Sequence, residues 1–213
     1  MIVMKKLCII GAGGFGREIY YGFRHQLSNV GFDEQDVLFI DDDLNKNNLI
    51  DYLEIKSFED FDPKLYTAII GIGNSITRKN VVSRLPSETD FISLVHDSAI
   101  VMDENIIINE GSIIAAGSIL TTNIIIGKHC QLNLNTTIGH DCVIGDFFTT
   151  APGVHISGNC NIGDNVYFGT NSSVRNNVNI CSNVTIGMGA VVTKDITEEG
   201  IYIGNPLKKL EKN

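Results

Sequence analysis

The sequence lacks an excess of positive charge. Among its 213 residues, 16 are Lys or Arg and 25 are Asp or Glu, so the formal charge is -9 and the pI is about 4.9. Proteins that bind nucleic-acid phosphates or anionic membrane surfaces carry basic patches. The composition therefore argues against both classes of protein, and we interpret the acidic surface as a solubilising one.

The chain also lacks an uninterrupted hydrophobic run. The apolar stretch 106–126 is as long as a membrane-spanning helix, but Asn109, Glu110 and Asn123 interrupt it. The opening sequence MIVMKKLCIIGAGGFG places lysines before apolar residues, as a secretory leader does. Its apolar part is short and meets a glycine turn, which predicts a first β-strand instead. We expect a cytoplasmic protein without membrane insertion.

Paired cysteines are missing as well. The five cysteines show no CxxC spacing and none of the density of a disulfide scaffold: Cys8, Cys130, Cys142, Cys160 and Cys181. We expect them to be small buried apolar residues in a reducing compartment.

The residues of the chain are arranged in two different patterns, and the first pattern extends to about residue 75. Apolar and helical stretches alternate there, in the order KLCIIGAGG, REIYYGFRHQL, DVLFIDDD and, after SFEDF, YTAIIGIGN. This alternation predicts a parallel sheet with crossover helices, equal to about half of a doubly wound nucleotide-binding fold. The stretch RKNVVSRLP predicts a further helix, and FISLVH leads out of the domain.

The turn after the first predicted strand has the spacing G-x-G-x-x-G, from Gly11 through Gly13 to Gly16. Backbone N–H groups at the start of a helix can hold a phosphate, and glycine lets the phosphate come close. Alone, the motif suggests a dinucleotide with Asp41 or Asp42 at a ribose. Because only half of a dinucleotide fold is present, a single nucleotide fits better.

The second pattern begins at Met102, where apolar residues start to recur at every sixth position. Fifteen of the sixteen positions from 102 to 192 are apolar, and the exception is Thr150. The next residue is Gly at 127, 139, 145, 163, 169 and 187, which suggests a corner that needs a permissive backbone. Four residues after most of these positions stands a small or β-branched residue, three of them cysteines, as an inward position with little space requires. This strict period predicts a hexapeptide β-helix with three hexads per coil.

Together these motifs resemble the hexapeptide acyltransferases, most closely the sialic-acid and bacillosamine branch of the sugar acyltransferases. The resemblance covers nearly the whole chain and rests on IIGAGGFGREI, FIDDD, GIGN, IGHDCVIGD, GAVVTKDI and GNPLKKL. It implies an α/β Rossmann-like βαβαβ domain over residues 1–98 and an all-β left-handed parallel β-helix over residues 99–213. It also implies a homotrimer that binds acetyl-CoA between neighbouring β-helices, with active sites at subunit interfaces.

The resemblance implies a general base at His140 and an orienting carboxylate at Asp141. An imidazole suits the removal of a proton from an attacking amine, because its pKa is near neutrality. The phase of the repeat places His140 just beyond a corner, pointing outward. Relatives often have a second histidine nine residues after the first, at a contact with the acyl donor. This chain has Thr149 there, whose hydroxyl can still hydrogen-bond the pantetheine or the thioester carbonyl.

The remaining site residues also follow from the resemblance. Those implied for the nucleotide sugar are Gly13, Gly14, Phe15, Asp41, Asp42, Gly73 and Asn74. Those implied for acetyl-CoA are Thr149, Gly158, Thr170, Gly187 and Met188. Relatives usually have histidine where Phe15 stands, so stacking replaces a polar contact or the contact is missing.

The histidine spacing does not fit a metal site. β-Helical carbonic anhydrases share this scaffold and bind zinc through three histidines, two of them close in sequence and two on neighbouring coils. Here His96, His129, His140 and His155 are 33, 11 and 15 residues apart, which matches neither a coil repeat nor a short ligand pair. We expect no metal cofactor.

These expectations combine into an acetyl-CoA-dependent N-acetyltransferase for a nucleotide-linked amino sugar, such as a 4-amino-4,6-dideoxyhexose, used in bacterial surface glycan synthesis. One alternative is O-acetylation of a sugar such as sialic acid, because the same base can deprotonate a hydroxyl. Another is a sensor without catalysis that binds a nucleotide and uses its β-helix to trimerise. The sequence leaves the nucleotide base, the sugar and the acyl chain open.

Overall fold

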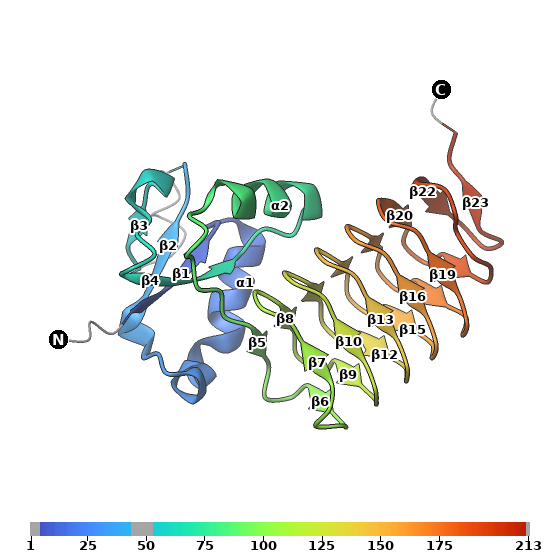
Figure 1. Ribbon diagram of the computed structural model, residues 1–213, viewed down its shortest axis with the longest axis horizontal. Helices are drawn as coiled ribbons and strands as arrows, with labels where there is room; N and C mark the ends of the chain where they lie inside the picture. Colours follow the sequence, from blue (N-terminus) through green and yellow to red (C-terminus); the bar gives the residue numbers. More distant parts are fainter. Residues whose placement is uncertain (1–4, 44–52, 212–213) are drawn as a thin grey trace. The chain divides into compact units, whose positions relative to one another are not determined.

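The chain forms two compact units, Met1–Ser93 and Leu94–Asn213. The computed structural model describes residues 5–43 and 53–211 (Figure 1). The fold class expected from the sequence is confirmed, since an α/β domain with a parallel sheet precedes a parallel β-helix. The division falls a few residues before the expected boundary at residue 98, because Leu94 already pairs with a strand of the β-helix.

The first unit is built on a parallel sheet of four strands in the order β3-β2-β1-β4. The strands are β1 (Lys6–Ile10), β2 (Val37–Ile40), β3 (Ile55–Lys56) and β4 (Tyr66–Ile70). The three longer strands match the three apolar runs of the sequence and are almost entirely buried, as strands covered on both faces are. The two-residue strand β3 was not predicted, because it is too short to show an alternating pattern.

Among the described residues, two helices and three 3-10 turns accompany these strands, and the second helix follows the last strand of the sheet. The helices are α1 (Gly14–Phe23) and α2 (Ser75–Arg84), and the turns are η1 (Arg24–Val30), η2 (Glu34–Asp36) and η4 (Phe58–Asp60). Helix α1 buries Ile19, Tyr20 and Phe23 on one face. The helical stretch continues as η1 and ends at Gly31, whose left-handed φ of 89° suits a glycine.

The second unit consists of coils that each contribute short strands to three parallel sheets (Figure 1). The sheet of five strands contains β7 (Ile107–Ile108), β10 (Ile125–Ile126), β13 (Val143–Ile144), β16 (Asn161–Ile162) and β19 (Asn179–Ile180). The sheet of six contains β6 (Ile100–Val101), β9 (Ile119–Leu120), β12 (Thr137–Ile138), β15 (His155–Ile156), β18 (Ser173–Val174) and β21 (Val191–Val192). The sheet of eight contains β5 (Leu94–Val95), β8 (Ile113–Ile114), β11 (Gln131–Leu132), β14 (Thr149–Thr150), β17 (Tyr167–Phe168), β20 (Val184–Ile186), β22 (Gly200–Ile203) and the antiparallel β23 (Lys208–Lys209).

The strand register confirms three hexads per coil. Ile126 pairs with Ile144, Ile138 with Ile156 and Thr150 with Phe168, so each residue lies beside the one 18 positions further along. The period-six residues from Ile114 to Val192 are all buried, with at most 3% of their surface exposed. Met102 departs from the prediction and is 62% exposed, because Val101 and not Met102 pairs with Leu120, so the period shifts by one residue in the first coil.

The glycines that follow the period-six positions correct one expectation. None of the six, all within the described range 53–211, has a left-handed φ. Their absent side chains instead let successive coils approach, since a Cβ on Gly127 would lie 2.5 Å from the carbonyl carbon of Gly145. The left-handed corner comes two residues later, at positions mostly occupied by Asn or Gly: Gly111, Gly117, Asn123, His129, Asn135, Asp141, Phe147, Gly153, Asn159, Asn165, Asn171, Asn177, Asn183 and Gly189.

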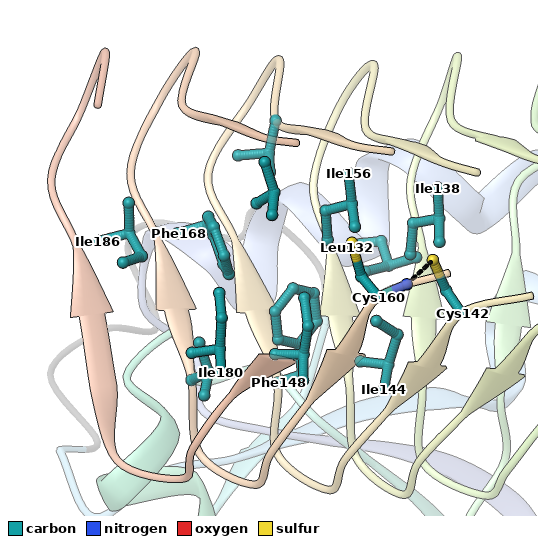
Figure 2. Packing of buried hydrophobic residues seen from close by; sticks show 14 of the residues in the cluster. Leu132, Ile138, Cys142, Ile144, Phe148, Ile156, Cys160, Phe168, Ile180 and Ile186 are labelled. Atoms are coloured by element: carbon teal, nitrogen blue, oxygen red, sulfur yellow. Dashed lines mark hydrogen bonds between the residues drawn. The ribbon is translucent and has the colours of Figure 1, made fainter. Parts of the chain in front are cut away.

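The polar exception in the period, Thr150, is compensated within the core. Its hydroxyl accepts a hydrogen bond from the Asn133 backbone N–H at 2.9 Å and lies 2.7 Å from the Thr136 hydroxyl. A large residue, Phe148, occupies the neighbouring inward position and packs against Phe168 with ring centroids 5.7 Å apart (Figure 2). The volume lost at the period-six position is therefore regained beside it.

The cysteines of the repeat fill the core as expected. Cys130, Cys142 and Cys160 are fully buried, and Figure 2 shows Cys142 and Cys160 stacked among the aliphatic side chains. The Cys160 backbone N–H donates to Cys142 Sγ at 3.4 Å. The hydrogen bond with Cys160 and then burial raise the pKa of the Cys142 thiol, so it stays protonated and unreactive.

The close approach of coils predicts that Gly127→Ala destabilises the β-helix. The added Cβ would meet the backbone of Gly145, which cannot rotate away, so we expect a loss of about 3 kcal/mol in the free energy of unfolding. Thr193→Ala is the matched control, because Thr193 holds the same place in the hexad and already has a Cβ. Chemical denaturation of both variants measures the difference, and equal stability of Gly127→Ala and the parent would contradict this explanation.

Candidate functional site

The predicted nucleotide-sugar residues gather at one edge of the first sheet. Gly13, Gly14 and Phe15 follow β1, Asp41 and Asp42 follow β2, and Gly73 and Asn74 follow β4. Because β1 lies between β2 and β4, this edge is a topological switch point, where open α/β sheets bind ligands. The loops after β1 and β4 lie close together, since a Cβ on Gly71 would come within 2.9 Å of the Gly11 carbonyl oxygen.

The glycines of this edge divide into two roles. Gly11 has a φ of +105°, and a Cβ on Gly16 would lie 1.8 Å from the Gly11 carbonyl oxygen, so both are needed for the fold. At Gly13 and Gly14, by contrast, a Cβ would meet nothing within 4 Å. Gly13 is the N-cap of α1, and no side chain caps it. Open space thus lies beside backbone N–H groups that an anion can approach.

The structure gives Asp41 a partner that sequence reasoning missed. Its carboxylate accepts hydrogen bonds from the Ala12 N–H at 2.8 Å and the Asp43 N–H at 2.9 Å. Asp41 therefore fixes the glycine turn, and Asp42 beside it has an exposed side chain.

Side-chain hydrogen bonds from Asn74 and Arg78 fix the loop after β4. Asn74 caps α2, since its Oδ1 accepts from the Thr77 N–H at 2.9 Å. Arg78 is fully buried and donates from Nη1 to the carbonyls of Ile72 at 2.9 Å and Gly73 at 3.1 Å. Sequence reasoning missed Arg78, because its spacing within the helix does not show which way it points.

The predicted base stands exposed at a corner of the β-helix. His140 follows β12 and precedes β13, so it lies where the sheet of six strands turns into the sheet of five. Its side chain is 56% exposed, and its Nδ1 lies 2.7 Å from Asp141 Oδ2. A carboxylate can only accept, so Nδ1 carries the proton and Nε2 is the ring's acceptor.

The pairing of His140 with Asp141 depends on the left-handed corner. Neighbours on a strand point apart, but Asp141 has a φ of 61°, which turns its carboxylate back to the preceding ring. The other carboxylate oxygen accepts from Asn123 Nδ2 at 2.5 Å. The hydrogen bonds from Asn123 and His140 lower the pKa of the Asp141 carboxyl below its ordinary value. Asp141 therefore remains a charged acceptor through the neutral range.

Gly158 lies against the imidazole on the next coil. A Cβ at this position would come within 2.6 Å of His140 Nε2 and 2.7 Å of its Cε1. Gly158, predicted to contact acetyl-CoA, thus has no side chain at the place that the His140 ring occupies. This contact could have been predicted from the sequence, because Gly158 stands 18 residues, or one coil, after His140.

The other predicted acetyl-CoA residues lie at a different corner. Thr170 and Met188 stand one coil apart, where the sheet of eight strands turns into the sheet of six, and Gly187 adjoins them. Met188 is 78% exposed. Thr149 lies on β14 in the sheet of eight and is 5% exposed. One chain therefore brings Gly158 to His140 and leaves the other four residues elsewhere on the β-helix.

Within 5–43 and 53–211, no three His, Cys, Asp or Glu side chains are grouped so that they could hold a metal ion. In the same ranges, no helix has the length and apolar character needed to cross a membrane.

Two family models match the chain. Residues 6–85 match the PglD N-terminal domain, and residues 159–194 match the bacterial transferase hexapeptide model of six repeats. The GDP-perosamine N-acetyltransferase of Escherichia coli O157:H7 is 31% identical over 155 residues, which is 70% of this chain and 69% of that protein.

Solved structures agree over almost the whole length. WeeI from Acinetobacter baumannii AYE is 31% identical with a TM-score of 0.85, and the match covers 97% of this chain and 100% of that one. The acetyltransferase domain of PglB from Neisseria gonorrhoeae FA1090, in complex with acetyl coenzyme A, is 27% identical with a TM-score of 0.81 and covers 97% and 99%. The chain thus belongs to the hexapeptide-repeat sugar acyltransferases, the family that includes GDP-perosamine N-acetyltransferase, and is itself an acyltransferase.

Proposed function

We propose that the protein transfers an acetyl group from acetyl-CoA to the amine of a nucleotide-linked amino sugar, such as a 4-amino-4,6-dideoxyhexose for bacterial surface glycans. The observation that carries the proposal is the exposed His140, whose Nδ1 is held by Asp141 at 2.7 Å. This pair leaves Nε2 as an oriented proton acceptor, which acyl transfer to an amine requires. The likeness to an N-acetyltransferase and to a domain bound to acetyl-CoA supports the choice of substrates.

In the proposed reaction, the sugar amine attacks the thioester carbonyl carbon of acetyl-CoA while Nε2 of His140 takes the amine proton. A carbon–nitrogen bond forms, the carbon–sulfur bond breaks, and the CoA thiolate leaves and is protonated. Transfer is direct, since the cysteines around the site, Cys142 and Cys160, are buried and no acyl-enzyme is needed. Asp141 stabilises the imidazolium that forms and keeps its charge throughout.

We propose the sheet edge of the first unit as the site for the nucleotide diphosphate. The N–H groups at the start of α1, beside the open space at Gly13 and Gly14, suit the diphosphate. Asp41 and Asp42 suit a ribose or base, the ring of Phe15 can stack on the sugar nucleotide, and Gly73 with Asn74 closes the pocket. These assignments extend the resemblance residue by residue.

We also propose a homotrimer with the active site between two chains. The reason lies in the corners of the β-helix, because His140 and Gly158 stand at one and Thr170 and Met188 at another. A neighbouring chain related by three-fold symmetry can bring its own Thr170 and Met188 to the His140 corner. Acetyl-CoA then lies between the two β-helices.

A thiol-release assay tests the reaction. Acetyl-CoA with UDP-, dTDP-, GDP- or CMP-linked amino sugars should release CoA, and His140→Ala should lower kcat about 10²- to 10⁴-fold, the usual contribution of a general base. Turnover with free sialic acid but with no amino sugar would favour O-acetylation. Binding without turnover of any acceptor would contradict the proposed reaction.

Gly158→Ala tests whether the position of the His140 ring matters for activity. The new Cβ would displace the His140 ring from the position that Asp141 holds, so we expect kcat to fall about a hundredfold. The clashing atoms belong to an exposed side chain that can rotate, so thermal stability should change little. An active Gly158→Ala enzyme would show that the ring works from another position.

Mixed assemblies test the shared site. We expect a mass of three times 23.3 kDa in solution. His140→Ala and the double variant Thr170→Glu/Met188→Glu should each be inactive, the latter because the carboxylates repel the phosphates of CoA. When the two are co-expressed in equal amounts, about one quarter of the interfaces combine an intact His140 with an intact Thr170 corner, so activity should return. No recovery would contradict a site shared between chains.

A further inference from the structure

We propose that Asn123 and Asp103 are positioning residues that act on the base through Asp141. This inference rests on the proposed function, because it takes His140 as the group that accepts the proton. Asn123 stands 18 residues before Asp141, at the same left-handed corner one coil earlier. Nothing in the sequence pattern distinguishes it from the other asparagines of this series.

The first step is the direct contact. Each carboxylate oxygen of Asp141 has its own partner. Oδ2 lies 2.7 Å from His140 Nδ1, and Oδ1 lies 2.5 Å from Asn123 Nδ2. A carboxylate on an exposed corner with one partner can rotate about its side-chain bonds. With an amide on its far oxygen, the plane of the carboxylate is fixed, and so is the direction from which it holds the imidazole.

The second step is the support of the amide itself. Asp103 Oδ2 accepts from the Asn123 backbone N–H at 3.1 Å and from Thr122 Oγ1 at 2.6 Å. Asp103 Oδ1 accepts from the backbone N–H and the side-chain Nδ2 of Asn105, each at 2.9 Å. The bond from Thr122, followed by those from Asn105 and Asn123, holds the pKa of the Asp103 carboxyl well below its usual range. A charged Asp103 therefore fixes the corner that carries Asn123.

The third step is the chemical identity of the residue. An amide donates to Asp141 without adding charge, whereas a carboxylate at this place would face the carboxylate of Asp141. The hydrogen bonds around this amide involve Asp141, His140 and Asp103, and Glu104 lines the same surface as Asp103 and Thr122. All of these titratable groups except His140 are carboxylates, so a further carboxylate would take up a proton at higher pH than an isolated one.

Two substitutions separate positioning from folding. Asn123→Gly keeps the left-handed corner, at φ 52°, and removes the amide. We expect kcat to fall about tenfold with an unchanged KM for acetyl-CoA, the rate equivalent of one charge-assisted hydrogen bond. Asn123→Asp keeps the shape of the side chain and the left-handed backbone, but replaces the amide donor with a carboxylate that can only accept. Its kcat relative to the parent should be lowest at pH 8 and rise toward pH 6, as a shared proton restores a donor.

Asn183→Gly is the control. Asn183 occupies the same place in the hexad, has a φ of 61°, and accepts a similar amide bond from Asn165 at 2.9 Å at another corner. Its activity should equal that of the parent. If Asn123→Gly loses no more activity than Asn183→Gly, or if Asn123→Asp shows a flat pH ratio, the positioning role is wrong.

Proton NMR gives a readout that needs no substrate. The Nδ1 proton of His140, held by Asp141, should give a downfield signal that disappears in His140→Ala. In Asn123→Gly we expect this signal to shift or broaden by exchange with water, and in Asn183→Gly to stay unchanged. An unaltered signal in Asn123→Gly would overturn the proposal. Because this measurement does not depend on turnover, it remains decisive even if no amino sugar proves to be the acceptor.

Discussion

The hydrogen bonds between successive coils constrain everything else in the β-helix. Backbone N–H groups bond to carbonyls one coil away, as Gly145 does to Ile162 and Gly163 does to Ile180 at 2.8 Å. Parallel strands joined in this way lie about 4.8 Å apart. At that spacing, a side chain on one coil always lies over the backbone of the next. The identity of a residue is therefore limited by the residue 18 positions away as much as by its neighbours in sequence.

This constraint explains which parts of the fold could be predicted. The inward positions repeat with a period of six, and burial of a large aliphatic side chain contributes about 1.5–3 kcal/mol, so selection leaves a strong pattern. The same arithmetic placed His140 outside the core. It could not show why glycine follows the apolar positions, because a close approach and a left-handed φ both select glycine. The structure separates them, with Gly127 facing the next coil and Asn123 or Asp141 adopting the positive φ.

In the first unit, the sequence predicted the strands but not the hydrogen bonds between the loops. Its long strands and the glycine turn were predictable, whereas the partners of polar residues were not. Asp41 and Asp42 were both predicted to contact a base or ribose, and the sequence did not show that the Asp41 carboxylate also holds the Ala12 and Asp43 N–H groups. Arg78 was not considered, although it fixes the carbonyls of Ile72 and Gly73. Hydrogen bonds between loops depend on side-chain direction, which neither periodicity nor composition contains.

At His140, the proposed base, the coil constraint and the proposed chemistry favour the same residues. A large ring at the corner position of one coil needs open space at that position of the next coil, and Gly158 provides it. The following residue must adopt a positive φ to turn back to the ring, and aspartate tolerates this conformation better than most side chains. The residue one coil earlier must also adopt a positive φ, and asparagine does so while offering a donor to that aspartate. Asn123, Asp141, His140 and Gly158 are thus joined in a series of contacts, in which each residue limits the choice of the one beside it.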